Sequence, residues 1–189
     1  MADLITLDEL RTIYGFTITS GGKTEAMYGA LVRSASQACM NFVGRDLSLR
    51  ESVEFQDGNG HDRFLLDNTP VVSIQSLSVD PLHRFESVLA SDEYRFDSAT
   101  GIVTLYGISV PAVKDCIRIS YTAGYDPIPD DVKAAVADTV QMMARRITGV
   151  SGGVTARTMA DGGTEQLETV APTDYAKFLL RAYRRNVIR

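Results

Sequence analysis

The chain has 189 residues, of which 44% are hydrophobic and 23% are charged, the balance of a folded globular protein. This composition excludes a disordered or collagen-like chain, and no apolar run approaches the roughly 20 residues of a transmembrane helix. The N-terminus lacks the basic flank and apolar run of a secretory signal peptide, so we expect a protein made and used in a cytoplasm.

The charge is negative overall but unevenly distributed. A net charge of −5 argues against a dedicated binder of duplex DNA, which normally presents a basic face. Residues 173–189 nevertheless contain five basic side chains and a single acid, Asp174. This basic C-terminal segment on an acidic protein predicts an electrostatic contact with a partner.

Two helices are predicted at the start of the chain. Leu7, Leu10 and Ile13 follow one another at intervals of three and predict a short helix over residues 8–14. A Gly-rich break precedes a long helix over residues 24–43, for which Thr24 is the expected N-cap and Gly44 the end. The apolar residues of this long helix recur at three and four: Tyr28, Leu31, Ala35, Cys39 and Phe42.

The periodicity then becomes that of β-strands between residues 51 and 123. The turn Asp57-Gly58-Asn59-Gly60 predicts a hairpin that joins strands at 53–55 and 64–66. A third strand follows at 71–79. The next two strands, at 94–96 and 102–106, form a second hairpin, and a sixth strand lies at 117–121.

Helical periodicity returns after Pro129. Asp130 and Asp131 at one end, with Arg145 and Arg146 at the other, match the dipole of a helix that ends near Gly149. Glycines, serines and threonines then predict a flexible arm, followed by an amphipathic helix over about 173–187.

These elements predict an α+β fold in one domain, in which a small core of about four helices holds an inserted antiparallel β module of about six short strands. The expected segments are N-terminal helices at 1–50, the β module at 51–123, a core helix at 124–149, the Gly-rich arm at 150–172 and the terminal helix at 173–189.

No motif predicts catalysis, a cofactor or a metal ion. Gly22-Lys23-Thr24 ends like a phosphate-binding loop, but Thr17 replaces its first glycine and no strand of a parallel sheet precedes it. The stretch from Asp57 to Asp62 lacks the glutamate of a calcium loop, and turn chemistry explains its residues. His83 has no recognisable nucleophile or carboxylate partner, and Cys39 and Cys116 are expected to be buried free thiols.

The terminal helix is the one candidate binding element. In a purely structural interpretation, the arginines of this helix face solvent and its aromatic residues pack on the rest of the protein. In the functional hypothesis, it is a docking helix on a flexible arm and becomes ordered when it binds. Aromatic and arginine side chains dominate the energetics of protein interfaces. The candidate docking residues are Tyr175, Phe178, Leu179, Arg181, Tyr183, Arg184 and Arg185.

Several segments resemble one known family in the same order along the chain. The most specific is Tyr121-Thr122-Ala123-Gly124-Tyr125, followed by the helix start Ile128-Pro129-Asp130-Asp131-Val132-Lys133. Further matches are the strand entry at 66–74, the hairpin residues 94–96 and 101–103, and the closing segment 179–185. Together these segments resemble the head–tail connector (adaptor, head-completion) proteins of tailed phages.

The resemblance implies a non-catalytic protein of the virion neck, assembled in the host cytoplasm, that needs no cofactor and contacts no membrane. It implies a ring, expected to contain twelve subunits, that docks on the portal protein through the C-terminal segment. Genome DNA would pass through the ring without sequence-specific binding, and a stopper or tail protein would follow it.

Other functions stay open on the sequence. A stopper or tail-completion protein would be expected to consist mainly of a β-barrel, and a packaging accessory factor would bind nucleic acid through the basic C-terminal segment. An enzyme is the remaining class.

Overall fold

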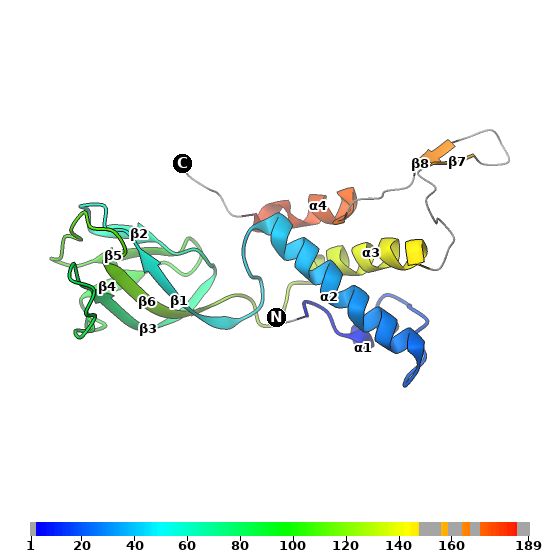
Figure 1. Cartoon of the computed structure of the whole chain (residues 1–189), viewed down its shortest axis with the longest axis horizontal. Coiled ribbons are helices and arrows are strands. Elements are labelled where there is room, and N and C mark those ends of the chain that lie inside the picture. The colour runs from blue at the N-terminus through cyan, green and yellow to red at the C-terminus, as the bar shows by residue number, and fades with distance from the viewer. Residues whose placement is uncertain (1–2, 148–155, 159–163, 167–170, 185–189) are drawn as a thin grey trace. The chain divides into compact units, whose positions relative to one another are not determined.

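The computed structural model describes residues 3–147, 156–158, 164–166 and 171–184 (Figure 1). The chain forms two compact units, whereas the sequence predicted one domain. We call them the helical unit, Met1–Asp46 with Pro127–Arg189, and the β unit, Leu47–Asp126. The predicted α+β fold, with four helices and an inserted antiparallel module of six strands, is confirmed in the described part of the chain.

The helices lie close to their predicted positions. They are α1 (Leu7–Thr12), α2 (Lys23–Val43), α3 (Asp130–Ile147) and α4 (Asp174–Leu180), and a 3₁₀ turn, η1 (Arg181–Tyr183), follows α4. Within the expected arm, β7 (Ala156–Thr158) and β8 (Thr164–Gln166) pair as antiparallel strands that the sequence did not predict. The remainder of residues 150–170 lies outside the described residues.

Local capping explains where the first two helices begin. Thr6 and Glu9 form a reciprocal capping box at the start of α1, in which each side chain accepts the other residue's backbone N–H. The N-cap of α2 is Gly22, and the expectation of Thr24 is wrong. The backbone N–H of Gly21 donates to the carboxylate of Glu25, a residue in the first turn of α2. The hydrogen-bond acceptor for the turn before the helix therefore comes from the helix itself.

The core of the helical unit is formed where α2, α3 and α4 pack on one another (Figure 1). Successive turns of α3 bury Val132, Val136 and Val140, all fully inaccessible to solvent. An ion pair between Lys133 of α3 and Glu9 of α1 attaches the first helix to this core. The hydrogen bond from Lys133, together with that from the backbone N–H of Thr6, lowers the pKa of the Glu9 carboxyl below its usual value near 4.5.

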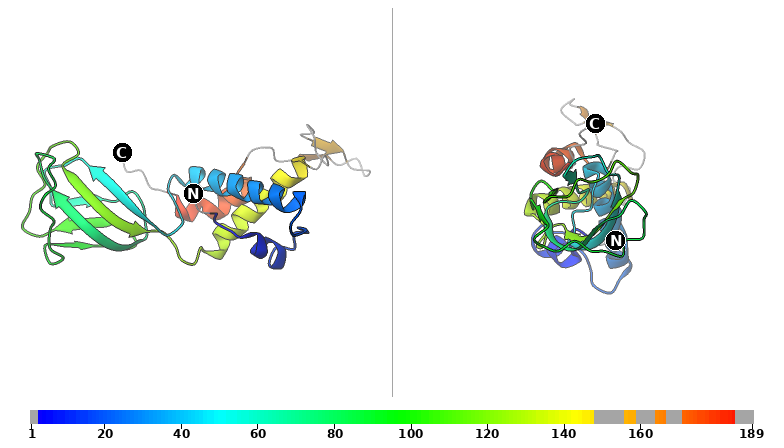
Figure 2. Two further views of the ribbon diagram at one scale, coloured as in Figure 1. Left: turned by 60° about the horizontal axis from the view of Figure 1, so that its bottom comes forward. Right: turned by 90° about the vertical axis from the view of Figure 1, so that its left-hand side faces the viewer.

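The β unit consists of two three-stranded antiparallel sheets. One has the order β1–β6–β3 and the other the order β2–β5–β4. The strands are β1 (Arg50–Gln56), β2 (Arg63–Leu65), β3 (Val71–Val79), β4 (Tyr94–Phe96), β5 (Ile102–Leu105) and β6 (Ile117–Ala123). The alternate residues of both sheets meet in one core, around which Figure 2 shows the strands arranged.

The predicted first hairpin is wrong, although both of its strands exist. β1 pairs over its whole length with β6, and β2 pairs with β5. The backbone N–H of Gly58 donates to Val113 at 2.8 Å, and the Asp57 carboxylate accepts the N–H of Asp115 at 2.8 Å. A side chain at Gly58 would overlap the carbonyl of Pro111, so this glycine permits the close approach of the loop β1–β2 to the loop β5–β6. The second predicted hairpin, β4–β5, is confirmed.

The two ends of the β unit lie side by side. Ser48 and Tyr125 form a parallel bridge, and the Tyr125 N–H donates to Leu47 at 2.9 Å. Gly124 lies between them with φ +117, and a Cβ there would come 2.3 Å from the carbonyl oxygen of Ser48. Only glycine fits this crossing, because the two chain segments touch through their backbones.

A buried tyrosine connects the centre of the β unit to its edge. The hydroxyl of Tyr121 donates to the Glu54 carboxylate at 2.7 Å and accepts the N–H of Asn68 at 3.2 Å. The ring is fully buried, and burial with the adjacent carboxylate raises the pKa of Tyr121. A hydrogen bond to a charged partner inside the protein is stronger than one at the surface.

Replacing this hydroxyl tests how much it stabilises the β unit. We expect Tyr121→Phe to lower the free energy of unfolding by about 2 kcal/mol, since it leaves a carboxylate without its buried donor. Urea unfolding measures the change. Tyr106→Phe is the matched control, because that side chain is half exposed; an equal loss in both variants would contradict the role of the Tyr121 hydroxyl.

The ion pair between α1 and α3 predicts a dependence on pH. Because the folded-state pKa of Glu9 is lowered, its contribution to stability is present above the unfolded pKa and is lost as pH falls through the folded value. We expect Lys133→Met to lower the free energy of unfolding by about 1 kcal/mol at neutral pH, with a smaller difference in acid below about pH 4. Lys114→Met, in the β unit, is the control, and a pH-independent difference would contradict the assignment.

Candidate functional site

The terminal helix begins at a buried threonine that contacts α3. The hydroxyl of Thr173 accepts the N–H of Ala176 at 3.0 Å as the N-cap of α4, and donates its own hydrogen to the carboxylate of Asp138. Thr173 is almost completely buried. The start of α4 is therefore held on the surface of α3 by a single side chain that satisfies two groups.

The other end of the segment is attached to the same helix. The Tyr183 hydroxyl lies 2.7 and 2.8 Å from the two carboxylate oxygens of Asp131, one residue after the start of α3. Asp131 and Asp138 are seven residues apart, which places them on one face of α3, two turns from each other. We call this pair of contacts, Thr173–Asp138 and Tyr183–Asp131, the carboxylate clasp.

Between the two contacts of the clasp, α4 buries an apolar face. Ala176 and Leu180 are fully inaccessible to solvent, at the spacing of one helical turn. Beyond the clasp, the Arg184 guanidinium lies 5.6 Å from the centre of the Phe42 ring at the end of α2. This cation–π contact holds the Arg184 side chain against α2.

The exposed face of α4 carries two large aromatic side chains. Tyr175 is 56% and Phe178 65% exposed, and Arg181, three residues further, is also exposed. We call these three residues the aromatic–basic stripe; they follow one another at intervals of three and share one side of the helix. Leu179 is half-buried beside them.

The structure thus divides the predicted docking residues into two groups. Tyr175, Phe178 and Arg181 are exposed and form the first group. In the second group, the hydroxyl of Tyr183 is bound to Asp131, and Arg184 is exposed but lies over the Phe42 ring. The hydroxyl of Tyr183 is directed towards Asp131 of α3, whereas Tyr175 and Phe178 are exposed. Arg185 lies outside the described residues.

The terminal helix is also shorter than the predicted span of 173–187. The α-helical hydrogen bonding of α4 ends at Leu180, and the chain tightens into the 3₁₀ turn that carries Tyr183 towards Asp131. Residues 173–183 are already packed on α3, so the expectation that the helix becomes ordered on binding does not describe them.

The other sequence candidates have structural roles. Asn59 bridges the turn after β1 by accepting the N–H of His61 and donating to the carbonyl of Arg63. His83 shares a hydrogen bond of 2.8 Å with the carbonyl of Lys114. In the described part of the chain, no group of three or more His, Cys, Asp or Glu side chains could hold a metal ion.

The two cysteines are buried free thiols, as predicted, and they lie in different units. Burial raises the pKa of the Cys39 thiol to about 11, so the thiolate is disfavoured at neutral pH. None of the described helices combines the length and the apolar character required to cross a bilayer.

Comparison with known proteins assigns a family to this arrangement. The family model for the head completion protein matches residues 3–184, almost the whole chain. The chain belongs to the head completion protein family. The predicted role as a structural head–tail connector of the phage neck is confirmed by this membership. Among curated proteins, none matches the chain in sequence.

Solved structures of gene transfer agent (GTA) particles share the fold of this head completion protein. A chain in the "neck of empty GTA particle computed with C6 symmetry" has a TM-score of 0.66 at 20% identity, over 100% of this chain and 95% of that one. A chain in the "neck of native GTA particle computed with C12 symmetry" has a TM-score of 0.57 at 20% identity, with 87% of each chain covered. A third, from the virion of the native particle, has a TM-score of 0.58 at 21% identity, over 89% of this chain and 81% of that one.

The carboxylate clasp was missed on the sequence. Thr173 before an acidic residue and an apolar run is an N-cap pattern that could have been recognised. Asp131 was noted only for its place at a helix start, and Asp138 not at all. Their separation of seven residues on a helix was the available signal for a shared face.

Loosening the clasp should release α4 from α3. We expect Thr173→Ala and Tyr183→Phe each to accelerate amide hydrogen exchange in residues 174–183 by about fivefold to tenfold, because each removes a hydrogen bond to a carboxylate. Mass spectrometry of the exchanged peptides measures this. Tyr175→Phe, on the exposed face, should leave exchange unchanged, and unchanged exchange in Tyr183→Phe would contradict the clasp.

Proposed function

We propose that this head completion protein is the adaptor that docks on the portal protein through the aromatic–basic stripe. The observation that carries the proposal is the exposure of Tyr175 and Phe178 on a helix whose opposite face is fixed to α3. Large aromatic side chains and arginine are enriched among the residues that dominate binding energy. A rigid helix presents them with little loss of conformational entropy on binding.

The chemistry of the stripe indicates the kind of surface it meets. Two apolar rings require an apolar contact area on the portal, and Arg181 beside them can pair with a carboxylate there. Arg184, whose guanidinium lies over the Phe42 ring, adds a second positive charge to that of Arg181. The contact therefore combines a desolvated aromatic centre with a charged rim.

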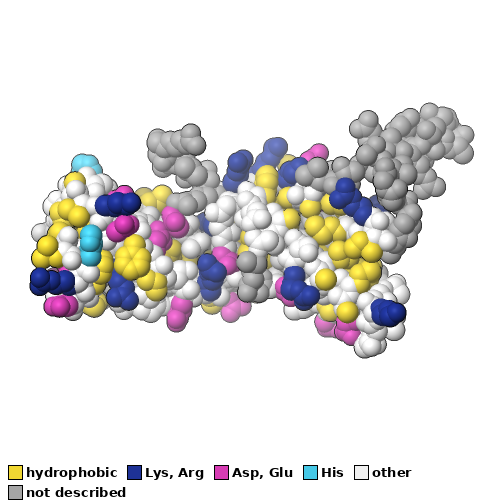
Figure 3. Space-filling model, in the orientation of Figure 1, with side chains coloured by type: hydrophobic (Ala, Val, Ile, Leu, Met, Phe, Trp, Pro, Cys, Tyr) yellow, Lys and Arg dark blue, Asp and Glu magenta, His cyan; other side chains and the backbone are white. Residues whose placement is uncertain are grey.

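A ring around the DNA channel is the second part of the proposal. Solved neck structures with this fold were computed with C6 and C12 symmetry, which supports a ring and is compatible with twelve subunits. The β unit holds twelve acidic and six basic residues, a balance that lets the genome pass without tight binding. On the face drawn in Figure 3, both charges are interspersed over the described β unit, without a continuous basic surface.

In this role the protein catalyses no reaction and requires no cofactor. It belongs to the virion neck, is assembled in the host cytoplasm, and offers a platform to the stopper or tail protein that follows. The support is the family membership together with the absence of a recognisable catalytic motif in the sequence.

Substitution of the stripe tests the docking. We expect the double variant Tyr175→Ala/Phe178→Ala to bind the purified portal protein at least about 100-fold more weakly, because aromatic hot spots each contribute about 2 kcal/mol or more. Electron microscopy should show coaxial rings on portals with the wild-type chain and bare portals with the variant. Tyr106→Ala, an exposed tyrosine of the β unit, is the matched control.

Point variants are preferred to truncation for this test. Removing the chain after Pro172 would expose the α3 surface that Ala176 and Leu180 cover, and would combine unfolding with loss of docking. Full ring formation by the double variant would exclude the stripe as the portal contact. A ring that forms on the tail side instead would indicate the stopper or tail-completion function.

A further inference from the structure

We propose that the outer face of the sheet β2–β5–β4 binds a carboxylate side chain of a partner protein, between Arg63 and Arg95 and above Thr104. The site belongs to the β unit and does not rest on the docking proposed for the helical unit. It provides this head completion protein with a second binding surface, of a different chemistry from the aromatic–basic stripe.

The strand register creates the site. Arg63 of β2 and Arg95 of β4 are both paired with Thr104 of the central strand β5, so the three residues form one row across the sheet. The flanking positions Phe64 and Val103 are buried in the core, which directs this row to the opposite, outer face. The two arginine Cα atoms are thus separated by two strand spacings, about 9.5 Å.

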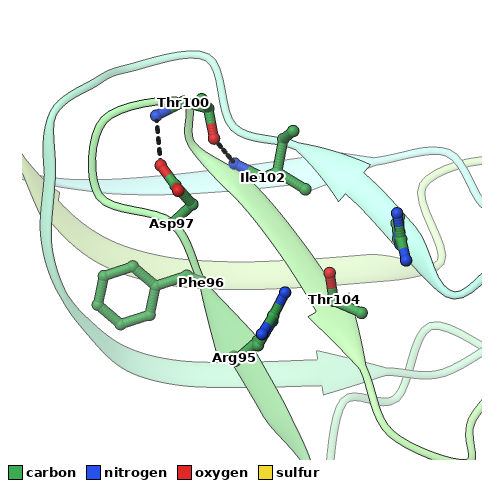
Figure 4. A pocket seen from close by; sticks show the side chains of 7 residues that line it. Arg95, Phe96, Asp97, Thr100, Ile102 and Thr104 are labelled. Atoms are coloured by element: carbon green, nitrogen blue, oxygen red, sulfur yellow. Dashed lines mark hydrogen bonds between the residues drawn. The ribbon is translucent and has the colours of Figure 1, made fainter.

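An open cleft of about 410 Å³ lies over this row. Figure 4 shows Arg95 and Thr104 side by side on neighbouring strands, with Ile102 and Thr100 further along the cleft. An arginine side chain is long enough for both guanidinium groups to reach an anion placed above the Thr104 hydroxyl. Guanidinium groups match the planar geometry of a carboxylate, and the hydroxyl supplies a third donor.

Both arginines are available to a ligand. The Arg63 side chain is 68% exposed, and its nearest carboxylate, Asp62, lies 3.9 Å away and is itself 55% exposed, so this ion pair is weak. Arg95 has no carboxylate of a described residue within 4.0 Å; its charge acts on Asp97 from a greater distance. Asp97 also lines the cleft, but its carboxylate accepts the backbone N–H of Thr100 at 2.8 Å and closes the β4–β5 turn (Figure 4).

The neighbouring row suits the aliphatic part of an acidic side chain. Leu65 and Ile102 face each other across β2 and β5, and both are about two-fifths exposed. An acidic residue flanked by apolar residues in an extended segment would place its carboxylate between the arginines and its neighbours on this apolar row.

Charge favours a single carboxylate over duplex DNA as the occupant. The β unit carries twice as many acidic as basic residues, and Asp62 and Asp97 stand beside the two arginines. A duplex presents one phosphate charge for about every 1.7 Å of its axis, and its binding depends on many cations acting together. A protein segment with one acid brings a single negative charge to the two arginines, and so meets less repulsion from Asp62 and Asp97 than a row of phosphates would.

Titration of the full-length protein with a capped Val-Glu-Val peptide tests the site. We expect the backbone amide signals of Arg63, Arg95 and Thr104 to shift in NMR spectra, with no comparable shift for the Val-Gln-Val peptide. Arg63→Gln and Arg95→Gln should each weaken binding of the glutamate peptide by about tenfold, as expected for a lost charge-assisted hydrogen bond.

The controls separate this site from general electrostatic attraction. Arg118→Gln, an exposed arginine on β6 in the other sheet, should bind the glutamate peptide like the wild type. Equal binding of both peptides, an equal loss in Arg118→Gln, or no shift at millimolar peptide would overturn the proposal. A short DNA duplex that shifts the same amides more strongly than the peptide would also overturn it, in favour of a phosphate site.

Discussion

The two carboxylates of α3 that form the clasp determine what the helical unit presents to solvent. Asp131 and Asp138 are about 10.5 Å apart along the helix axis, a distance that spans most of α4. By holding Tyr183 and Thr173, they rotate α4 so that Leu180 is buried and Phe178 is exposed. An aromatic ring left in water is unfavourable for the isolated chain, and its fixed exposure is the basis of the docking proposal.

The sequence predicted most elements because their signals are local. Apolar residues at helical spacing placed α2 and α3 within one or two residues, and alternation placed the strands. The failures come from partners far along the chain: β1 pairs with β6, whose residue Ile117 lies 61 positions after Gln56, and Asp131 fixes Tyr183 from 52 positions away. A turn motif or a helical wheel contains no information about a pairing partner so far along the chain. The sequence therefore singled out the terminal helix, but not which of its side chains are exposed and which are bound to α3.

The two units differ in chemistry as well as in fold. The helical unit contains the basic C-terminal segment and an exposed aromatic face, whereas the β unit holds half of the chain's acidic residues in fewer than half of its positions. Two of the six basic residues of the β unit, Arg63 and Arg95, lie in one row on the outer face of the sheet β2–β5–β4. Separate partners at the two surfaces would suit a neck protein, which must join neighbours of different kinds.

The close backbone contact at the ends of the β unit has a consequence for how such proteins diversify. Since Ser48 and Tyr125 form a parallel bridge at a crossing that Gly124 permits, the β unit can be regarded as a cassette with both of its connections at one point. A cassette of this kind can be lengthened, replaced or removed while the chain ends at Asp46 and Pro127 stay within reach of a short linker. Evolution could thus exchange the surface of the β unit while the helical unit keeps its own binding surface.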